Sequence, residues 1–186
     1  FGRMKRMRQV LPGIIRPDVI PTEKGFAVTE LDSVPGGFGL TSALMSLYED
    51  PSWEITGEGI PSLFYKMAGS VTKEPTPNIA IVVSDEAKDY LSEMQYLGSL
   101  LNNKGVYVVH PKDMSFRDEG LFVMDMGKWV RVDVLYRFFE LFDLKNIPKS
   151  ELLLYATKKG QVITTPPYKP WLEEKLSFAL FSHPSL

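Results

Sequence analysis

Apolar residues follow two different patterns along the chain, and the pattern changes near residue 78. Residues 78–83 and 106–109 are nearly unbroken apolar runs, which are typical of strands buried on both faces of a parallel sheet. Between them, residues 85–103 have the spacing of a long amphipathic helix, and Lys104-Gly105 is a helix-ending signal. A strand, a helix and a second strand in this order predict a βαβ unit with two parallel strands.

Shorter elements are predicted on both sides of this unit. Extended residues 14–21 and 26–32 flank the turn Thr22-Glu23-Lys24-Gly25, and this pattern predicts a β-hairpin. Near residue 41 we expect a helix to about residue 49, with Thr41 or Ser42 as its N-cap. The other expected elements are helices at 60–67, 150–158 and 171–181, a strand at 161–165, and a second hairpin with strands 121–124 and 129–132.

The fold class that these elements predict is α/β, with a Rossmann-like layer from residue 78 onward. Residues 72–77, Thr-Lys-Glu-Pro-Thr-Pro, are proline-rich and lack periodicity, so we interpret them as a linker. The linker separates residues 1–71, which hold the first hairpin and two short helices, from residues 78–186. The sequence contains no internal repeat and no low-complexity tract.

Charged side chains are predicted to gather on one face of the first hairpin. With the turn centred on Lys24, the numbers of cross-strand partners sum to about 48. The resulting pairs are Asp18 with Glu30, Arg16 with Asp32, and Ile20 with Val28. Two carboxylates about 5 Å apart repel by about 3 kcal/mol at an effective dielectric constant near 20, and Mg²⁺ would relieve that repulsion. Two interpretations stay open: a metal site, or a solvated face with an ordinary salt bridge.

A glycine-rich loop follows the hairpin directly. Pro35-Gly36-Gly37-Phe38-Gly39 begins three residues after Asp32 and ends just before a predicted helix. Glycine lets backbone amides approach an anion, and a helix N-terminus favours negative charge. Such a loop is by itself more often a tight turn. Beside a carboxylate cluster it predicts a segment that binds a substrate carboxylate or phosphate, formed by Ser33, Gly36, Gly37, Gly39 and Thr41.

Composition and charge exclude several classes of site. The 186 residues include no cysteine and two histidines, which excludes disulfides, thiolate sites and a multi-histidine metal site within one chain. A formal charge of −2 argues against a general polyanion-binding surface. The basic start, with Arg3, Lys5, Arg6 and Arg8, is interpreted as a solvated end rather than a nucleic-acid contact. From the charge and this interpretation of the basic start we expect no nucleic-acid partner. No apolar stretch is long enough to span a membrane and no secretory signal is visible, so we expect no membrane association and a cytoplasmic location.

The charged hairpin resembles the metal-binding hairpin of one enzyme family. Arg16-x-Asp18, eleven further residues and then Glu30-x-Asp32 is similar to the pattern of circularly permuted ATP-grasp ligases, especially glutathionylspermidine synthase-like proteins. In that family the arginine contacts the transferring phosphate, and the Asp, the Glu and a final Asn hold two Mg²⁺ ions. Asp32 stands where the family has Asn. The glycine loop also differs, since the synthases carry small hydroxyl residues there.

The resemblance implies an ATP- and Mg²⁺-dependent carboxylate–amine ligase that acts through an acyl phosphate. It assigns a catalytic role to Arg16 and the binding of Mg²⁺ to Asp18, Glu30 and Asp32. Residues 78–186 become a Rossmann-like pre-ATP-grasp domain within an ATP-grasp architecture. The implied partners are ATP, a small-molecule carboxylate and an amine. In the family, the lysines that grip adenine lie mostly downstream of this segment, so we expect the chain to be part of a longer protein.

Other interpretations stay open beside this one. A non-catalytic binding or scaffolding domain with the ATP-grasp outline is the second hypothesis, and the unusual Asp32 favours it. Of the two histidines, His110 is interpreted as a structural residue at a strand end and His183 as a surface residue. Arg137, in the aromatic stretch 136–142, is expected either to reach an anionic ligand or to stack on its aromatic neighbours.

Overall fold

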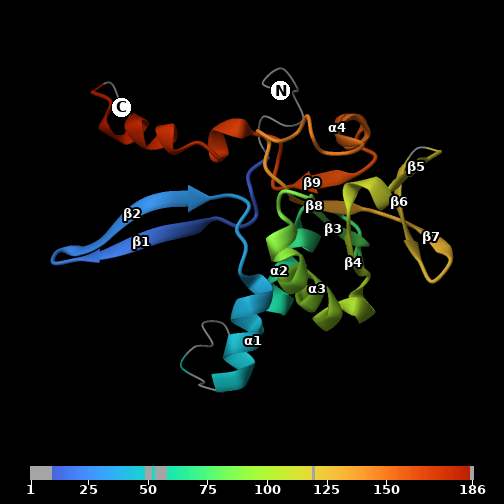
Figure 1. Ribbon diagram of the computed structural model, residues 1–186, viewed down its shortest axis with the longest axis horizontal. Coiled ribbons are helices and arrows are strands. Elements are labelled where there is room, and N and C mark those ends of the chain that lie inside the picture. The colour runs from blue at the N-terminus through green and yellow to red at the C-terminus, as the bar shows by residue number, and fades with distance from the viewer. Residues whose placement is uncertain (1–9, 49–51, 53–57, 119, 185–186) are drawn as a thin grey trace.

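A parallel sheet of four strands, in the order β4-β3-β8-β9, forms the centre of an α/β fold (Figure 1). The computed structural model describes residues 10–48, 52, 58–118 and 120–184. The strands of the central sheet are β3 (Ile79–Val83), β4 (Val106–Val109), β8 (Val134–Phe138) and β9 (Ile163–Thr165). All residues of β3 and β8 are buried, because both strands are covered on both faces.

The predicted βαβ unit is present, with a shorter helix than expected. β3 pairs in parallel with β4, and α3 (Leu91–Leu100) lies between them in the chain. The 3₁₀ turns η3 (Lys88–Tyr90) and η4 (Asn102–Lys104) lie before and after α3, within or at the end of the range predicted as helix, and residues 85–87 are not helical. β8 pairs with the other edge of β3, so the chain crosses from one side of β3 to the other.

Two apolar cores cover the two faces of the central sheet. On one face, Ile79 and Ile81 pack with side chains of α2 (Gly59–Ser70) and α3. On the other face, Ala80 and Val82 pack with side chains of α4 (Ser150–Lys159) and of a smaller antiparallel sheet. That sheet consists of β5 (Ser115–Arg117), β6 (Gly120–Asp125) and β7 (Lys128–Arg131). Its β6–β7 hairpin confirms the second hairpin that the sequence predicts.

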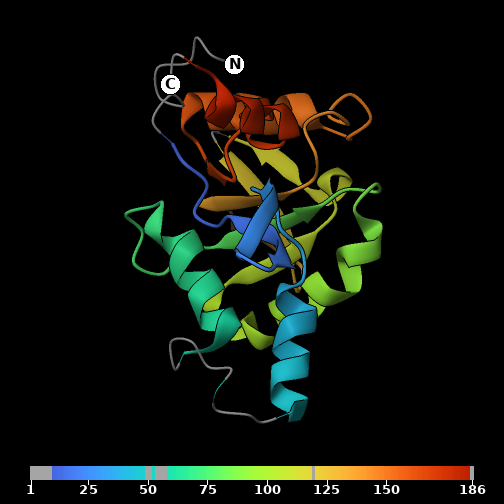
Figure 2. The ribbon, with the colours of Figure 1, turned by 90° about the vertical axis from the view of Figure 1, so that its left-hand side faces the viewer.

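The first hairpin projects from the body of the molecule (Figures 1 and 2). Its strands are β1 (Arg16–Thr22) and β2 (Gly25–Asp32), joined at the predicted turn, where Gly25 has a φ of 122°. Every residue of both strands is half-buried or exposed, and Phe26 is 75% exposed. The hairpin therefore presents its side chains to solvent and adds little to either core.

The predicted register of this hairpin is right at its base and wrong toward its tip. The two charged pairs at the base have the predicted partners. Beyond Asp18 the register shifts and Thr29 is skipped, so Ile20 pairs with Ala27 and not with Val28. Alternation within each strand cannot reveal such a bulge, because the extra residue changes only the pairing between strands.

Two other predicted helices have different bounds or a different type. α1 (Phe38–Tyr48) begins three residues earlier than expected, so neither Thr41 nor Ser42 is its N-cap. The Ser42 hydroxyl instead donates to the Phe38 carbonyl oxygen at 2.6 Å. In place of a last helix at 171–181, the chain forms two 3₁₀ helices, η6 (Pro170–Leu172) and η7 (Lys175–Ser182). A further 3₁₀ turn, η5 (Pro111–Asp113), follows β4.

Residues on both sides of the predicted linker contribute to one core. Val34, Phe64 and Ala68 belong to the same buried cluster as Ile79 and Ile81. The division into two parts at 72–77 stays a prediction. Among the helices of the described ranges, none combines the length and the apolar character needed to cross a bilayer.

Candidate functional site

The charged side chains of the first hairpin meet at its base, around Arg16. The Arg16 Nε atom lies 3.1 Å from Asp18 Oδ1, and its Nη2 atom lies 3.2 Å from Asp32 Oδ2. Its Nη1 atom donates a hydrogen bond to the Gly36 carbonyl oxygen at 3.3 Å, which connects the hairpin to the glycine-rich loop. Arg16, Asp18, Glu30 and Asp32 are called the charged patch below. The predicted gathering of these residues on one face is confirmed.

Glu30 completes the charged patch from the second strand. It is the cross-strand partner of Asp18, and its Oε2 atom lies 2.9 Å from the Nζ atom of Lys175 in η7. The hydrogen bond and the charge of Glu30 raise the pKa of Lys175. The C-terminal segment thus reaches the hairpin. Three carboxylates and two cations leave a net charge of −1 here.

The carboxylates of the charged patch fit a Mg²⁺ ion only if other ligands, such as phosphates and waters, complete its coordination. In the part of the chain that the structure describes, no three His, Cys, Asp or Glu residues are arranged to hold a metal ion. Asp18 and Glu30 are, however, direct cross-strand partners, and their side chains are 45% and 38% exposed. Mg²⁺ usually keeps several waters and is held by one or two carboxylates together with substrate phosphates. The patch therefore suits an ion that arrives with phosphate ligands, not a cage made by the protein alone.

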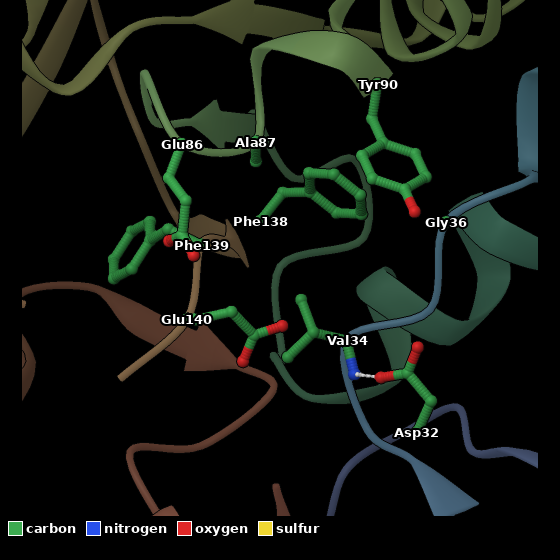
Figure 3. A pocket seen from close by; sticks show the side chains of 9 residues that line it. All are labelled: Asp32, Val34, Gly36, Glu86, Ala87, Tyr90, Phe138, Phe139 and Glu140. Atoms are coloured by element: carbon green, nitrogen blue, oxygen red, sulfur yellow. Dashed lines mark hydrogen bonds between the residues drawn. The ribbon is translucent and has the colours of Figure 1, made fainter. Parts of the chain in front are cut away.

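Asp32 is the least exposed carboxylate of the charged patch. Its Oδ1 atom accepts a hydrogen bond from the Val34 amide at 2.8 Å (Figure 3). Burial raises the pKa of Asp32, and the Val34 amide and Arg16 act in the opposite direction. The hydroxyl of Tyr136 is fully buried and has no hydrogen-bond partner among the described residues. Burial raises the pKa of Tyr136, and the nearby charge of Asp32 adds to the increase.

The glycine-rich loop directs its amides at a carboxylate of the chain itself. The Gly37 amide donates to Glu93 Oε1 at 2.6 Å, and the Leu40 amide donates to Oε2 at 3.2 Å. Glu93 belongs to α3, so a neighbouring helix supplies the negative charge that the start of α1 favours. A substrate anion at these amides would have to displace Glu93. The anion-binding role of the loop stays a prediction.

The glycines of the loop permit close contact between α1 and α3. A Cβ atom on Gly39 would lie 2.0 Å from the backbone oxygen of Glu93. On Gly36 it would lie 2.5 Å from the ring of Tyr90. These contacts explain two of the three glycines by packing alone.

The remaining loop residues have separate positions. Gly37 has a φ of 94°, a conformation that favours glycine. Ser33 is buried, and its hydroxyl has no hydrogen-bond partner in the described ranges. Thr41 lies in the first turn of α1, is exposed, and its amide donates to the Gly37 carbonyl oxygen at 2.8 Å. The structure thus brings Gly36 to the charged patch and leaves Thr41 farther along the helix.

A pocket that sequence analysis did not predict lies beside the charged patch (Figure 3). Its volume is about 150 Å³, and its lining residues are Asp32, Val34, Gly36, Glu86, Ala87, Tyr90, Phe138, Phe139 and Glu140. Glu86 follows β3 and Glu140 follows β8, so both stand at the carboxyl ends of parallel strands. Ligands of open α/β sheets bind at this end. An acidic residue shortly after each of two buried strands is the sequence signal that could have indicated the pocket.

Arg137 does not line this pocket, but it pairs with Glu173, which acts on the lining residue Glu140. The guanidinium is fully buried, and its Nη2 atom lies 2.5 Å from Glu173 Oε1. It also lies over the rings of Phe139 and Tyr168, at 5.6 and 5.8 Å from their centroids. Burial raises the pKa of Glu140 to about 7, and the neighbouring Glu173 carboxylate adds to the increase. The expectation that Arg137 stacks on aromatic neighbours is confirmed.

The two histidines lie away from the charged patch. His110 Nδ1 accepts a hydrogen bond from the Lys112 amide at 3.1 Å, and Nε2 lies 3.3 Å from Asp85 Oδ2. These contacts give His110 the structural role predicted for it at the end of β4. His183 is exposed, as predicted. The basic residues Arg3, Lys5, Arg6 and Arg8 lie outside the described residues.

Comparison with known proteins adds no relative. The sequence matches no family model, and no curated protein is significantly similar to it. Function therefore has to be inferred from the residues of the site and their geometry.

Proposed function

We propose that this chain is part of an ATP- and Mg²⁺-dependent carboxylate–amine ligase of the circularly permuted, glutathionylspermidine synthase-like ATP-grasp type. The observation that carries the proposal is the register of the first hairpin. It brings Arg16, Asp18, Glu30 and Asp32 to one patch beside the glycine-rich loop. The parallel order of the central sheet is compatible with a Rossmann-like pre-ATP-grasp layer from residue 78 onward. A cytoplasmic location belongs to the same proposal.

The roles of the charged patch follow from charge and exposure. When bound, Mg²⁺ neutralises charge on the phosphates of ATP. We assign its binding to Asp18 and Glu30, which face each other at the surface, and to Asp32 behind them. Arg16 carries a permanent charge and is 46% exposed, so its guanidinium can stabilise the phosphoryl group that passes from ATP to the substrate carboxylate.

The loop of residues 33–41 is the proposed site for the substrate carboxylate and the acyl phosphate. Its backbone amides, around Ser33, Gly36, Gly37, Gly39 and Thr41, would donate to the developing negative charge. The Gly37 amide, and the Leu40 amide of the same loop, now donate to Glu93. Substrate binding at this loop therefore includes an exchange in which the Glu93 carboxylate turns away.

A non-catalytic scaffolding domain is the second candidate, and one observation favours it. Arg16 is paired with Asp18 and Asp32, and Lys175 is paired with Glu30. These ion pairs stabilise the charged patch without any bound ion. In that case the patch would serve only to hold the hairpin against the loop and against η7.

Acyl-phosphate formation is the test that separates the two candidates. A protein containing this chain is incubated with ATP, Mg²⁺, a panel of small carboxylates and hydroxylamine, which converts an acyl phosphate into a hydroxamate. We expect carboxylate-dependent release of phosphate, with a loss of roughly 100-fold in Arg16→Lys and Asp18→Asn. Glu23→Gln, at the tip of the hairpin, is the matched control. Turnover that is equal in wild type and both variants would contradict the ligase proposal.

A further inference from the structure

The pocket beside the charged patch lies at the point where the topology of the central sheet reverses. From β3 the chain passes to β4 on one side, and β8 then pairs with the other side of β3. The last residues of β3 and β8, Val83 and Phe138, are direct partners, and the segments that follow them form two walls of the pocket. Such a crevice, at the carboxyl ends of strands where their order reverses, is the usual ligand site of open α/β sheets.

The lining of this pocket is acidic. Three of its nine residues, Asp32, Glu86 and Glu140, carry carboxyl groups, and none is Lys, Arg or His. The nearby cations are already engaged, Arg16 with Asp32 and Arg137 with Glu173. Burial, together with the charges of neighbouring acidic groups, raises the pKa of both Glu86 and Glu140. A bound cation would compensate the negative charges of these carboxylates.

Aromatic rings make the pocket suitable for an organic cation rather than a metal ion. The ring centroids of Tyr90 and Phe138 lie 5.5 Å apart, and the ring planes are inclined by 69°. Both residues line the pocket. Figure 3 shows the Tyr90 hydroxyl directed toward Gly36 and the Glu140 carboxylate directed toward Val34, both among the lining residues of the pocket. Rings attract ammonium groups through their faces and pack against carbon chains, whereas Mg²⁺ requires a shell of oxygen atoms. No three potential metal ligands are grouped here or elsewhere in the described ranges.

We propose that this pocket binds the primary ammonium group of a small organic cation. Glu140 and Glu86 are its carboxylate partners, and Tyr90 and Phe138 contact its first carbons. The volume of about 150 Å³ accommodates an ammonium group with a short alkyl chain. The role of this cation as the amine substrate rests on the proposed ligase function, while its binding does not. The pocket and the charged patch share Asp32, so the amine would enter beside the proposed acyl phosphate.

Binding is tested with propylammonium chloride, without ATP or Mg²⁺, by following the backbone amide signals of the 186-residue chain in NMR spectra. We expect saturable shifts at Gly36, Ala87 and Glu140, and none with 1-propanol, a neutral molecule of the same length. In Glu140→Gln the affinity should fall by roughly tenfold, because one charge-assisted hydrogen bond is lost. Glu74→Gln, at an exposed glutamate in the segment 72–77, is the matched control and should bind as wild type does.

Three results would overturn the proposal: no shifts with propylammonium, equal shifts with 1-propanol, or unchanged affinity in Glu140→Gln. The amide spectrum also reports whether Glu140→Gln is folded. Should it not be, Glu86→Gln replaces it with the same expected loss. Since ATP takes no part in this titration, its failure leaves the ligase proposal standing, and a ligase that fails to turn over ATP leaves the cation site standing.

Discussion

Asp18 and Glu30 face each other across the first hairpin, and each forms an ion pair with its own cation. The two cations come from different parts of the chain. Arg16 contacts Asp18 from the same strand, and Lys175 contacts Glu30 from the C-terminal segment. Two carboxylates in this relationship repel unless cations lie close to them. The patch is therefore stable as it stands. Under the proposed function it would exchange these partners for an ion held by phosphates.

Packing of the glycine-rich loop predicts a large effect of Gly39→Ala. The new Cβ atom would lie 2.0 Å from the backbone oxygen of Glu93, so α1 and α3 would have to move apart. We expect the free energy of unfolding to fall by about 1–3 kcal/mol, measured by urea denaturation. Gly69→Ala is the matched control, since its Cβ atom would meet only a Pro77 side chain at 3.8 Å. A Gly39→Ala variant as stable as wild type would show that the contact between the helices is looser than described.

The raised pKa of Glu140 predicts that the stability of the fold decreases as pH rises. Its pKa rises from 4.5 to about 7 on folding, because of burial and then Glu173. Between these values the folded chain holds a proton that the unfolded chain has lost, so the free energy of unfolding decreases as pH rises through this window. After allowance for partial solvent exposure, the decrease is on the order of 1–2 kcal/mol.

The Glu140→Gln variant isolates this contribution from those of Asp32 and Glu86, whose pKa values are raised as well. Urea denaturation at pH 5 and pH 8 should show a smaller decrease in stability in the variant than in wild type. Glu74→Gln should behave as wild type does. Identical pH dependence in Glu140→Gln and wild type would contradict the shifted pKa.

The buried ion pair of Arg137 and Glu173 predicts a strong loss of stability when one partner is removed. Arg137→Met leaves the Glu173 carboxylate, which is 12% exposed, without its cation, and removes hydrogen bonds to Pro166 and Pro167. We expect a loss of about 3–5 kcal/mol in thermal or urea denaturation. The exposed pair of Lys66 and Glu58 is the comparison, and Lys66→Met should change little. Equal effects of the two substitutions would show that Arg137 is not buried as described.

The parts of the fold that the sequence predicts are those with local signals. Unbroken apolar runs mark β3 and β4, and the short turn before Gly25 determines which residues face each other at the base of the hairpin. The bulge at Thr29 was not predicted, because it lies in the pairing between strands rather than in either strand. The start of α1 was also missed, since its amides bond to Glu93, more than fifty positions away.

The two sites differ in how far the sequence predicts them. Arg16 and Asp18 lie two positions apart in one strand, and the alternation of side chains along a strand places them on the same face. The acidic pocket is built from Asp32, at the end of β2, and from Glu86 and Glu140, which the parallel pairing of β3 with β8 brings to one place. That pairing joins strands about fifty residues apart, and no local pattern determines which buried strands become neighbours.

Calorimetric titration of Mg²⁺, with and without a non-hydrolysable ATP analogue, tests the central claim most directly. A protein containing this chain should bind the ion together with the analogue. Asp18→Asn should weaken this binding by roughly tenfold or more, because the ligand loses its negative charge. Glu23→Gln is the control: it removes one negative charge, as Asp18→Asn does, but at the tip of the hairpin. It should bind as wild type does. Binding that is equal in wild type and Asp18→Asn would contradict the assignment of the charged patch as a magnesium–nucleotide site.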